Sequence, residues 1–553
     1  MTTAEPATAE RALAEPAGGD RLRRADLIVL LGLVTIAALL RLPGLAARGG
    51  WDADQGSEMI VLWRLIHDGQ IPLVGPPTSI GDLHHGALYY FLLAPFAWIS
   101  NGDPRVVVGA IALGGVAAVG VTWWLARSIG GPVAGLVAGL LIAVSTSAVT
   151  ETTIIWNPSL VALSSSVALA GAWQAQRTGR AKWWILAAGG LVVTMQCHVL
   201  GIVLAPPLVG RFLLDLRRSP AGESRKRLLG AGLAAVLVVV IGYLPLIAHE
   251  LGSGFSETRA ALAFVGAGGQ AVALSLPARL LFVGLRIVAW PLVGSLTDHL
   301  GLGALVGVAT LAGIAWRAIA AAQPGRGEVR FLGATLVFGW LILGVGVGSM
   351  ATVTLLPVDQ YHAFLDPIVF VGVGVTIAAL WRLARAMPSR MVARGLVAAA
   401  TAGLVVFNLA NQPPSPALDG GWPAAEQASQ QILAATGGDP IELRGLPAFK
   451  GTDAYGFALV RAGASVAGTI DTPTPWSTAA ARSASGTGAV AGEVPAAVLA
   501  SGGAIVTICD ALFVADCGGP AEAAAVPATG FRLADRFPAA PGRTISVYLP
   551  GGR

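Results

Sequence analysis

Long apolar stretches separated by short polar segments fill the chain from about residue 27 to residue 410. A helix needs about 20 apolar residues to cross a hydrocarbon core that is about 30 Å thick. The pattern therefore predicts about eleven membrane-spanning helices, near 27–43, 104–126, 131–149, 158–175, 183–197, 199–215, 229–248, 300–319, 331–356, 362–381 and 394–410.

Two further apolar stretches, 83–99 and 277–297, do not fit a simple alternation of crossings. If 277–297 crossed alone, the loop from Arg317 to Arg330 would lie outside the cell, against the usual preference of basic loops for the cytoplasm. Both stretches are therefore interpreted as interfacial helices, with Arg279 and Arg286 along the polar side of the second one. If both cross instead, the number of spans becomes about thirteen and the orientation of the termini is unchanged.

The basic residues give this topology an independent test, because short loops rich in Lys and Arg stay in the cytoplasm. The turns at 150–157 and 357–361, on the other side of the predicted bilayer, carry neither residue type. We therefore expect a multi-pass protein of the plasma membrane with a cytoplasmic N-terminus and an extracytoplasmic C-terminus. The clusters that fall on the cytoplasmic side are Arg21, Arg23, Arg24, Arg127, Arg177, Arg180, Lys182, Arg211, Arg217, Arg218, Arg225, Lys226, Arg227, Arg317, Arg326, Arg330, Arg382, Arg385, Arg390 and Arg394.

The two ends of the chain differ from its apolar middle. Residues 1–24 are rich in Ala, Pro and Glu and lack an apolar core, which predicts a disordered cytoplasmic tail rather than a signal peptide. Residues 25–411 form the predicted membrane domain, and 412–422 form a Pro/Gly-rich linker. Beyond it, 423–553 predicts a small extracytoplasmic α/β domain, with a helix at 423–436 and strands at 441–446, 504–510 and 544–550.

Two of the three cysteines, Cys509 and Cys517, lie in this predicted external domain. An oxidising compartment would permit a disulfide that closes a short loop, and two free thiols are an equal alternative at this point. Cys197, at the end of a predicted membrane helix, is interpreted as a small packing residue.

Composition narrows the class of protein. Hydrophobic residues make up 54% of the chain, charged residues 12%, and the mean hydropathy is +0.69, whereas soluble domains carry about 25% charged residues. The net charge of +5 comes from Arg clusters between apolar stretches, without the basic face that nucleic-acid binding requires. The composition therefore indicates an integral membrane protein and excludes nucleic acid as a partner.

The predicted external loop 44–103 carries the densest group of ionisable residues near the membrane. Any one of them could serve only to solvate the loop. Apolar residues from Met59 to Ile66 recur at helical spacing, however, which predicts an amphipathic helix lying on the bilayer just after Asp54. This helix would hold the Asp54 carboxylate at the height of lipid headgroups. The ionisable residues are Asp52, Asp54, Glu58, Arg64, His67, Asp68, Asp82, His84 and His85.

Over roughly 25–410, these features resemble the GT-C class of polyprenyl-phosphate-sugar transferases, in particular the protein O-mannosyltransferase and aminoarabinose-transferase relatives of family 39. Asp54-Gln55 is similar to the Asp-Glu pair of the family's first external loop, with Gln in place of Glu and Asp52 as a nearby second acid. His84-His85-Gly86-Ala87-Leu88-Tyr89-Tyr90 resembles the family's His-Pro-Pro-Leu-Tyr-Tyr stretch. Trp156-Asn157-Pro158 is similar to another family element, although Asn before Pro also starts ordinary helices.

The resemblance implies an α-helical GT-C fold and an inverting transfer of a sugar from a polyprenyl-phosphate donor to an extracytoplasmic acceptor, which is a lipid, a glycan or a protein. Asp54 would be the general base. Positive groups would stabilise the departing phosphate, and Arg259 would either do so or pair with Glu250 or Glu257. The residues expected to bind the donor phosphate or line the cavity are His84, His85, Arg259, Arg286, Tyr361 and His362.

A metal ion and two other functions remain open at this point. Asp52, Asp54, Asp82, His84 and His85 offer ligands for a divalent ion, but no HExxH-like spacing defines a site. The rival functions are a multi-pass transporter and a membrane scaffold with an external binding domain. The ionisable residues gather in external loops and no internal repeat is evident, which favours the transferase over the transporter.

Overall fold

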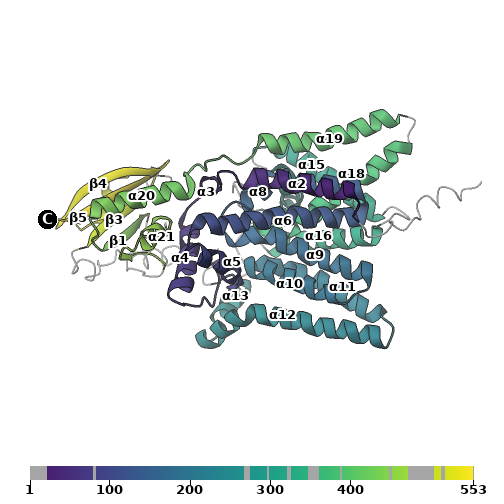
Figure 1. Ribbon diagram of the computed structural model, residues 1–553, viewed down its shortest axis with the longest axis horizontal. Coiled ribbons are helices and arrows are strands. Elements are labelled where there is room, and N and C mark those ends of the chain that lie inside the picture. The colour runs from purple at the N-terminus through teal and green to yellow at the C-terminus, as the bar shows by residue number, and fades with distance from the viewer. Residues whose placement is uncertain are drawn as a thin grey trace, which may run out of the picture.

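The computed structural model describes residues 22–78, 83–266, 274–294, 298–319, 325–346, 360–386, 389–447, 451–470, 503–511, 517–527 and 529–551. Asp82, a candidate metal ligand, lies outside these residues. The described chain forms a bundle of helices, with a smaller part that contains a sheet at one end (Figure 1). We refer to this end of the bundle as the domain end.

Each of the eleven predicted stretches contains a helix, and the helices run along the long axis of the molecule (Figure 1). Eight helical segments of the described chain are long and apolar enough to cross a membrane. The prediction of an α-helical polytopic membrane protein is therefore confirmed. The helices in the eleven predicted stretches are α2 (Arg24–Arg41), α6 (Pro104–Gly130), α7 (Pro132–Val144), α9 (Val161–Thr178), α10 (Lys182–Cys197), α11 (Ala205–Arg218), α12 (Glu223–Ser253), α15 (Leu300–Ile319), α16 (Arg326–Gly346), α18 (Asp366–Ala386) and α19 (Arg390–Ala410).

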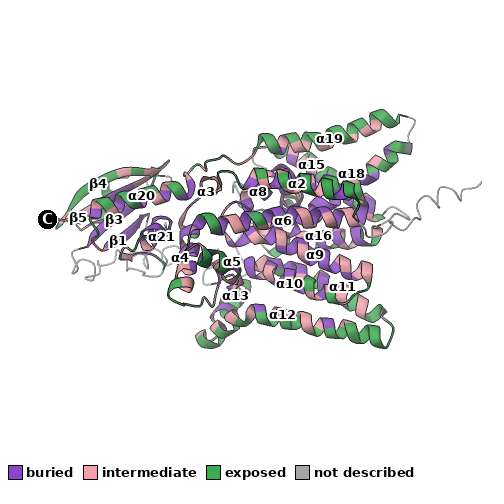
Figure 2. Ribbon diagram, viewed as in Figure 1, coloured by how far each residue is buried: buried purple, intermediate pink, exposed green. Residues whose placement is uncertain are grey.

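The helices differ sharply in how much of their surface the protein covers (Figure 2). The start of α18 is buried on all sides, because α18 packs against α6, α7, α15, α16 and α19. In α12, by contrast, large apolar side chains such as Leu233 and Ile241 are more than 60% exposed. A helix that is apolar all round while its surface is uncovered requires an apolar solvent, so these faces are suited to lipid hydrocarbon.

Short helices gather at the domain end of the bundle, where α3, α4, α5 and α13 lie between the long helices and the sheet (Figure 1). The 12 residues of α5 are too few to cross a bilayer, in line with the interfacial interpretation of 83–99. These elements are α3 (Leu45–Arg48), α4 (Ala53–His67), α5 (Leu88–Ile99), α8 (Thr146–Glu151), η1 (Asn157–Leu160), η2 (Val199–Leu204), α13 (Ser256–Gly266) and η3 (Gln360–Leu365).

The helix α14 (Leu276–Val293) lies across the bundle at the domain end. Near its start, Arg279 Nη2 donates to the carbonyl of Val345, close to the end of α16 (3.3 Å). Near its end, the carbonyl of Pro291 accepts from Ser145 Oγ, just after α7 (2.7 Å). Both ends of α14 thus meet the same end of the bundle. One part of the prediction is wrong: Arg286 is only 2% exposed, because α15, α16 and α18 cover the helix and leave it no free polar side.

The C-terminal part forms a five-stranded sheet in the order β2-β1-β3-β5-β4. The strands β1, β2 and β3 are parallel, and β5 and β4 form an antiparallel hairpin. The sequence did not indicate β4, because this edge strand is mostly exposed and lacks a clear apolar alternation. The elements are α20 (Gly421–Thr436), β1 (Ile441–Leu446), α21 (Asp453–Arg461), β2 (Val466–Ala467), β3 (Ala504–Asp510), α24 (Pro520–Ala525), β4 (Phe531–Ala540) and β5 (Arg543–Pro550).

The three cysteines take different roles. Cys509, in β3, and Cys517 are joined in a disulfide with a sequence separation of 8. Cys197 is free and buried, as expected for a packing residue.

The sheet-containing part docks directly on the start of α4. Trp51 packs edge-on against Trp422 of α20, with ring centroids 4.6 Å apart, and its Nε1 donates to the carbonyl of Ala454 in α21 (2.7 Å). A Cβ at Gly56 would lie 2.0 Å from the carbonyl oxygen of Asp453, so only glycine allows α4 and α21 to approach this closely. The expectation that α4 lies on the bilayer is therefore wrong. Its apolar side chains, including Met59, are buried by protein.

Candidate active site

The first turn of α4 fixes the position of Asp54. Asp52 caps the helix by accepting from the amide of Ala53 (2.9 Å), and Gln55 Oε1 accepts from the amide of Asp52 (2.9 Å). Asp54 is the second residue of the helix, and its side chain is exposed. The free amides and the positive end of the helix dipole favour a carboxylate here. Asp54 is thus a preorganised anion that a substrate can reach.

Gln55 explains why this chain departs from the family's acidic pair. Its side chain is 5% exposed, and its Nε2 donates to the carbonyl of Ile155 just before η1 (3.1 Å). A glutamate here would have no proton for that carbonyl when ionised. Gln55 therefore ties α4 to the segment before η1.

Asp52 is not available as a second acid of the site. Besides capping α4, its Oδ1 accepts from Arg543 Nη2 of β5 (3.1 Å). The Asp52 side chain thus caps α4 and takes part in the contact between the two parts of the chain.

A second carboxyl group, that of Glu58, lies one helical turn after Asp54 and is buried, with 2% exposure. Neither oxygen has a hydrogen-bond partner among the described residues. Burial, together with the negative charge of Asp54, raises the pKa of Glu58 well above its ordinary value, although the Tyr89 hydroxyl and the backbone of Asn157 act in the opposite direction. The buried setting of Glu58 therefore favours its protonated form. The sequence pattern predicted Glu58 only as one of the ionisable residues of the loop. Its spacing of four residues from Asp54 was the signal that could have placed both carboxyl groups on one face of the helix.

Tyr89 and Tyr90, at the start of α5, complete this group of residues. Both rings are buried, and burial, with the charge of Glu58 as the next cause, raises the pKa of each hydroxyl well above its ordinary value. The charge of Asp54 also acts on Tyr90. Both tyrosines thus remain protonated hydrogen-bond donors beside the two carboxyl groups.

The remaining family element, Asn157, is buried in η1 and its Nδ2 donates to the carbonyl of Cys197 (2.5 Å). It therefore connects the end of α10 to the turn that lies beside Glu58. This contact places Asn157 as a support for the site.

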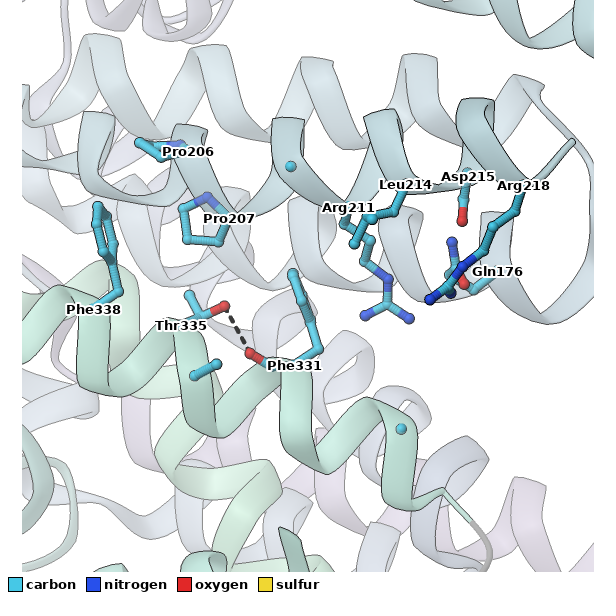
Figure 3. Close-up of a pocket in the computed structure, with 13 residues that line it drawn as sticks. Gln176, Pro206, Pro207, Arg211, Leu214, Asp215, Arg218, Phe331, Thr335 and Phe338 are labelled. Carbon is cyan, nitrogen blue, oxygen red and sulfur yellow. Dashed lines mark hydrogen bonds between the residues drawn. The ribbon is translucent and has the colours of Figure 1, made fainter.

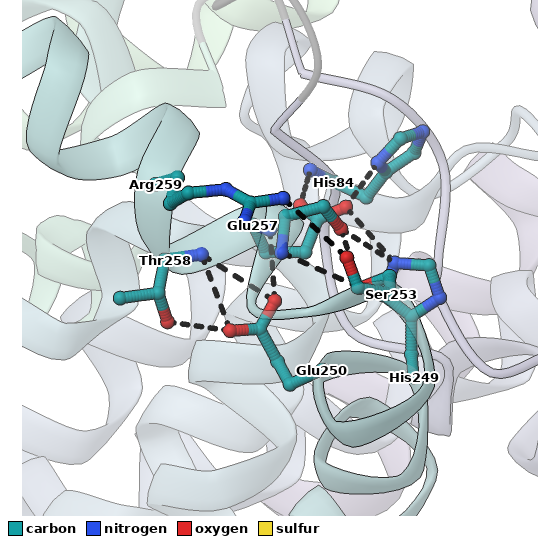
Figure 4. Close-up of polar contacts among 8 residues, drawn as sticks. His84, His249, Glu250, Ser253, Glu257, Thr258 and Arg259 are labelled. Carbon is teal, nitrogen blue, oxygen red and sulfur yellow. Dashed lines mark hydrogen bonds and ion pairs between the residues drawn. The ribbon is translucent and has the colours of Figure 1, made fainter.

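A second group of polar residues surrounds His84 and α13 (Figure 4). Glu257 accepts from the backbone amide of His84 (2.7 Å) and pairs with its Nδ1 (2.8 Å), while His249 Nε2 lies 3.6 Å from the same carboxylate. Glu250 caps α13 by accepting from the amide of Glu257 (2.8 Å) and from the hydroxyl of Thr258 (2.5 Å). Both acids of this group therefore already have partners.

These contacts decide between the two interpretations of Arg259. Its guanidinium donates to the carbonyl of Ser253 (3.4 Å), and it forms no ion pair with Glu250 or Glu257 in the described chain. Its side chain is exposed. Arg259 is therefore a cation that remains accessible to an anionic ligand.

His85 differs from the cation that the sequence suggested. It is 7% exposed, and its Nδ1 accepts from the amide of Val199 (3.2 Å). Burial, reinforced by His198 and His84, lowers the pKa of His85 well below its ordinary value. The ring is therefore neutral at pH 7 and acts through hydrogen bonding and packing, because an imidazolium would be left desolvated here.

The other candidates lie deeper in the bundle. The ring of Tyr361 contacts that of His198, with centroids 5.9 Å apart, and His198 lies 5.1 Å from His85. His362 is fully buried and its Nδ1 lies 3.0 Å from Asp366, so it holds the start of α18. Arg286 lies against the ring of Phe282 (5.5 Å) inside the bundle. Of these three, only Tyr361 joins the row of rings that begins at His85.

The candidate metal ligands do not assemble in one place. Within the residues that the structure describes, no three His, Cys, Asp or Glu side chains come together in a way that could hold a metal ion. Asp54 instead belongs to the group with Glu58 and the two tyrosines, and His84 to the group with Glu257.

The fold and part of the sequence match known proteins. Residues 84–244 match the family described as dolichyl-phosphate-mannose-protein mannosyltransferase. The structure is similar to ArnT from Cupriavidus metallidurans in the apo state, with a TM-score of 0.59 and 15% identity over 95% of this chain and 98% of that chain. It is also similar to the same protein bound to undecaprenyl phosphate, with a TM-score of 0.60 and 14% identity over the same shares of the two chains.

No curated protein sequence matches the chain at a significant level. The family match begins at His84 and includes two of the three motifs on which the resemblance was based, His84 to Tyr90 and Trp156 to Pro158, whereas Asp54-Gln55 lies before it. The predicted resemblance is therefore confirmed: part of the chain matches this family, and the whole fold is similar to that of ArnT.

Proposed function

We propose that the chain transfers a sugar from a polyprenyl-phosphate donor to an acceptor of the cell envelope, with Asp54 as the general base. The observation that carries the proposal is the exposed Asp54 carboxylate at the start of α4, one helical turn before the buried Glu58. The similar ArnT structure contains undecaprenyl phosphate, and the matching family is named for transfer from dolichyl-phosphate mannose, which supports this donor class.

The reaction needs no nucleotide, because a lipid phosphate is already a leaving group. The acceptor hydroxyl gives its proton to Asp54 while its oxygen attacks the anomeric carbon. The bond between this carbon and the phosphate oxygen breaks, and the lipid phosphate leaves with the electron pair. A single displacement inverts the sugar configuration, and a positioned base contributes about 10²–10⁴-fold to the rate.

Glu58 supports Asp54 through its raised pKa. If Glu58 were ionised, a second negative charge would lie one helical turn away in a buried setting and would disfavour the Asp54 carboxylate. Because burial favours the protonated form of Glu58, it favours an arrangement with one negative charge, at the place where a proton must be accepted.

The departing phosphate needs a positive partner, and Arg259 is our candidate. It is exposed, it lies on α13 at the domain end, and neither neighbouring acid pairs with it. A cation that meets the leaving group stabilises the charge that develops in the transition state. His84, held at Glu257, supports the loop next to this cation.

The orientation in the plasma membrane follows from charge. The connections from α9 to α10 and from α11 to α12 carry basic clusters and lie far from the sheet (Figure 1). With these loops in the cytoplasm, the sheet-containing part and Asp54 face the outside. Because this part docks on α4, it forms one side of the approach to Asp54 and contributes to the choice of acceptor.

The test compares wild type, Asp54→Asn and Asp68→Asn in lipid, with a panel of polyprenyl-phosphate sugars as donors and cell-envelope extract as acceptor. Asp68 provides a matched control, because it lies at the other end of α4 in an exposed pair with Arg64 (2.7 Å). We expect Asp54→Asn to lose at least about 10²-fold in turnover while Asp68→Asn remains active. A folded Asp54→Asn protein with wild-type turnover would contradict the assignment of the base.

A further inference from the structure

A groove between α11 and α16 is a cavity that the proposed reaction does not use (Figure 3). Its volume is about 590 Å³. Near the domain end, η2 packs against α16, and α11 follows η2 directly along the chain. Toward the opposite end of the bundle, α11 and α16 are joined by the ion pair between Arg211 and Glu328. In Figure 1, α11 lies toward the end of the bundle opposite to the sheet, away from α4, and none of the residues that line the groove belongs to α4 or α5.

The groove has an apolar half and a polar half (Figure 3). Pro206, Pro207 and Phe338 line the part nearer to the domain end. Gln176, Arg211, Asp215 and Arg218 line the other part, close to the basic connection between α11 and α12. A molecule that fits this wall needs an apolar body and a polar, negatively charged head.

The two arginines of the polar half differ in their surroundings. Arg211 stacks over the ring of Phe331 (4.2 Å) and pairs with the buried Glu328 (2.5 Å), but its Nη1 has no hydrogen-bond partner among the described residues. Arg218 is exposed and forms no ion pair with a described carboxylate. The polar half therefore offers the exposed guanidinium of Arg218, which forms no ion pair with the neighbouring Asp215 in the described chain, and one unused donor of the Arg211 guanidinium.

The positive lining continues beyond the groove. Two further cavities follow the groove. The first, of about 250 Å³, shares the lining residue Arg218 with the groove, and the second, of about 550 Å³, shares Arg180 with the first. Lys182 and Arg227 line the outer one together with Glu223, whose carboxylate lies 3.7 Å from Arg227. Exposed apolar side chains such as Val209 and Leu213 flank the groove on α11 and are suited to lipid hydrocarbon.

From this charge complementarity we infer that the groove binds a lipid with an anionic phosphate headgroup, from the leaflet opposite to the proposed active site. The phosphate lies at Arg218 and Arg211, and the first part of an acyl or prenyl chain lies along Pro206, Pro207 and Phe338. Basic pockets between membrane helices on the cytoplasmic side have this chemistry. A free anion would use only the polar half, whereas a lipid uses both halves.

Two substitutions separate the headgroup from the chain. Arg218→Gln removes the free charge without disturbing a described ion pair. Gly210→Leu fills the groove, because nothing lies within 4 Å of a Cβ at this lining position. Arg217→Gln is the matched control, since Arg217 is also exposed on α11 but does not line the groove.

The measurement is native mass spectrometry of the full chain in detergent, titrated with phosphatidylglycerol, with a polyprenyl phosphate, or with phosphatidylcholine as the zwitterionic comparison. We expect an anionic lipid to bind in preference to phosphatidylcholine. Arg218→Gln should weaken its binding about fivefold, as one arginine near a headgroup contributes about 1 kcal/mol. Gly210→Leu should weaken it as well, and Arg217→Gln should not. Whichever of the two anionic lipids binds identifies the source of the phosphate.

Two results would overturn the inference. Equal effects of Arg217→Gln and Arg218→Gln would mean diffuse attraction to a basic surface without a site. Displacement of the lipid by inorganic phosphate, with no effect of Gly210→Leu, would mean a site for free anions. Sugar transfer is not part of this readout, so the outcome is independent of the proposed function.

Discussion

The ionisation of Glu58 gives the sharpest test of the candidate site. Glu58→Gln replaces a neutral buried acid by a neutral side chain of the same shape, so the packing beneath Asp54 is preserved. In the unfolded chain Glu58 ionises at its ordinary pKa of 4.5, whereas burial keeps it protonated in the folded protein to a much higher pH. Folding of the wild type must therefore take up a proton over this range of pH, and folding of the variant need not.

The sign and size of the effect follow from proton linkage. A carboxyl group with a raised pKa in the folded state costs no stability below its unfolded pKa, and the cost grows as the pH rises toward the folded pKa. The slope is about 1.4 kcal/mol per pH unit. We therefore expect Glu58→Gln to match wild type below about pH 4.5 and to become the more stable protein as the pH rises toward 7.

The assay is thermal unfolding of wild type, Glu58→Gln and Asp68→Asn in the same detergent at several pH values between 4 and 8. Asp68 is exposed, so its substitution controls for the loss of a carboxyl group on α4 without burial. A difference between Glu58→Gln and wild type that stays constant with pH, or that falls as the pH rises, would refute the reasoning that Glu58 is neutral in the folded protein.

Three further predictions follow from contacts around α4 and α5. Gln55→Glu should lower the free energy of unfolding by about 1–3 kcal/mol, because it removes a donor to a buried carbonyl; thermal unfolding measures this loss. Gly86→Ala should destabilise the protein in the same assay, because the added Cβ would lie 1.8 Å from the Gln196 side chain, and Gln196→Ala in the same chain should relieve the clash. Arg543→Ala should weaken the docking of the sheet-containing part on α4 by about 1 kcal/mol or less, because its partner Asp52 is partly solvated. Limited proteolysis near residues 412–420 should then become faster. Arg532→Ala, on the neighbouring strand, is the control.

Much of the site was visible in the sequence, but its ionisation was not. Asp54 stands out as an acid before an apolar helical pattern, and the stretch from His84 to Tyr90 carries the family likeness. The neutral state of His85 depends on burial against the start of η2 and on His198, more than a hundred residues later. A pKa reflects desolvation by all neighbours, and a linear pattern does not say which neighbours those are.

Among the helices and strands, too, the sequence predicted some features and missed others. The apolar stretches predicted the long helices because a bilayer requires every crossing to be apolar and to satisfy its own backbone hydrogen bonds. The helix α14 was predicted as a helix, yet the burial of Arg286 was missed. The strands β1 and β3 were predicted because the apolar runs beyond the linker shorten to strand length, whereas β4 was missed because its exposed face carries polar residues.

The sequence by itself determined that the chain lies in a lipid bilayer, where its long helices are, its class of fold and the helix that carries Asp54. These features depend on local hydropathy and on short motifs. Only the tertiary structure decided the burial and the raised pKa of Glu58, the role of Gln55, the accessibility of Arg259 and the docking of the C-terminal sheet on α4. Each of these depends on contacts between residues that lie far apart along the chain, and such contacts set burial and charge only once the chain has folded.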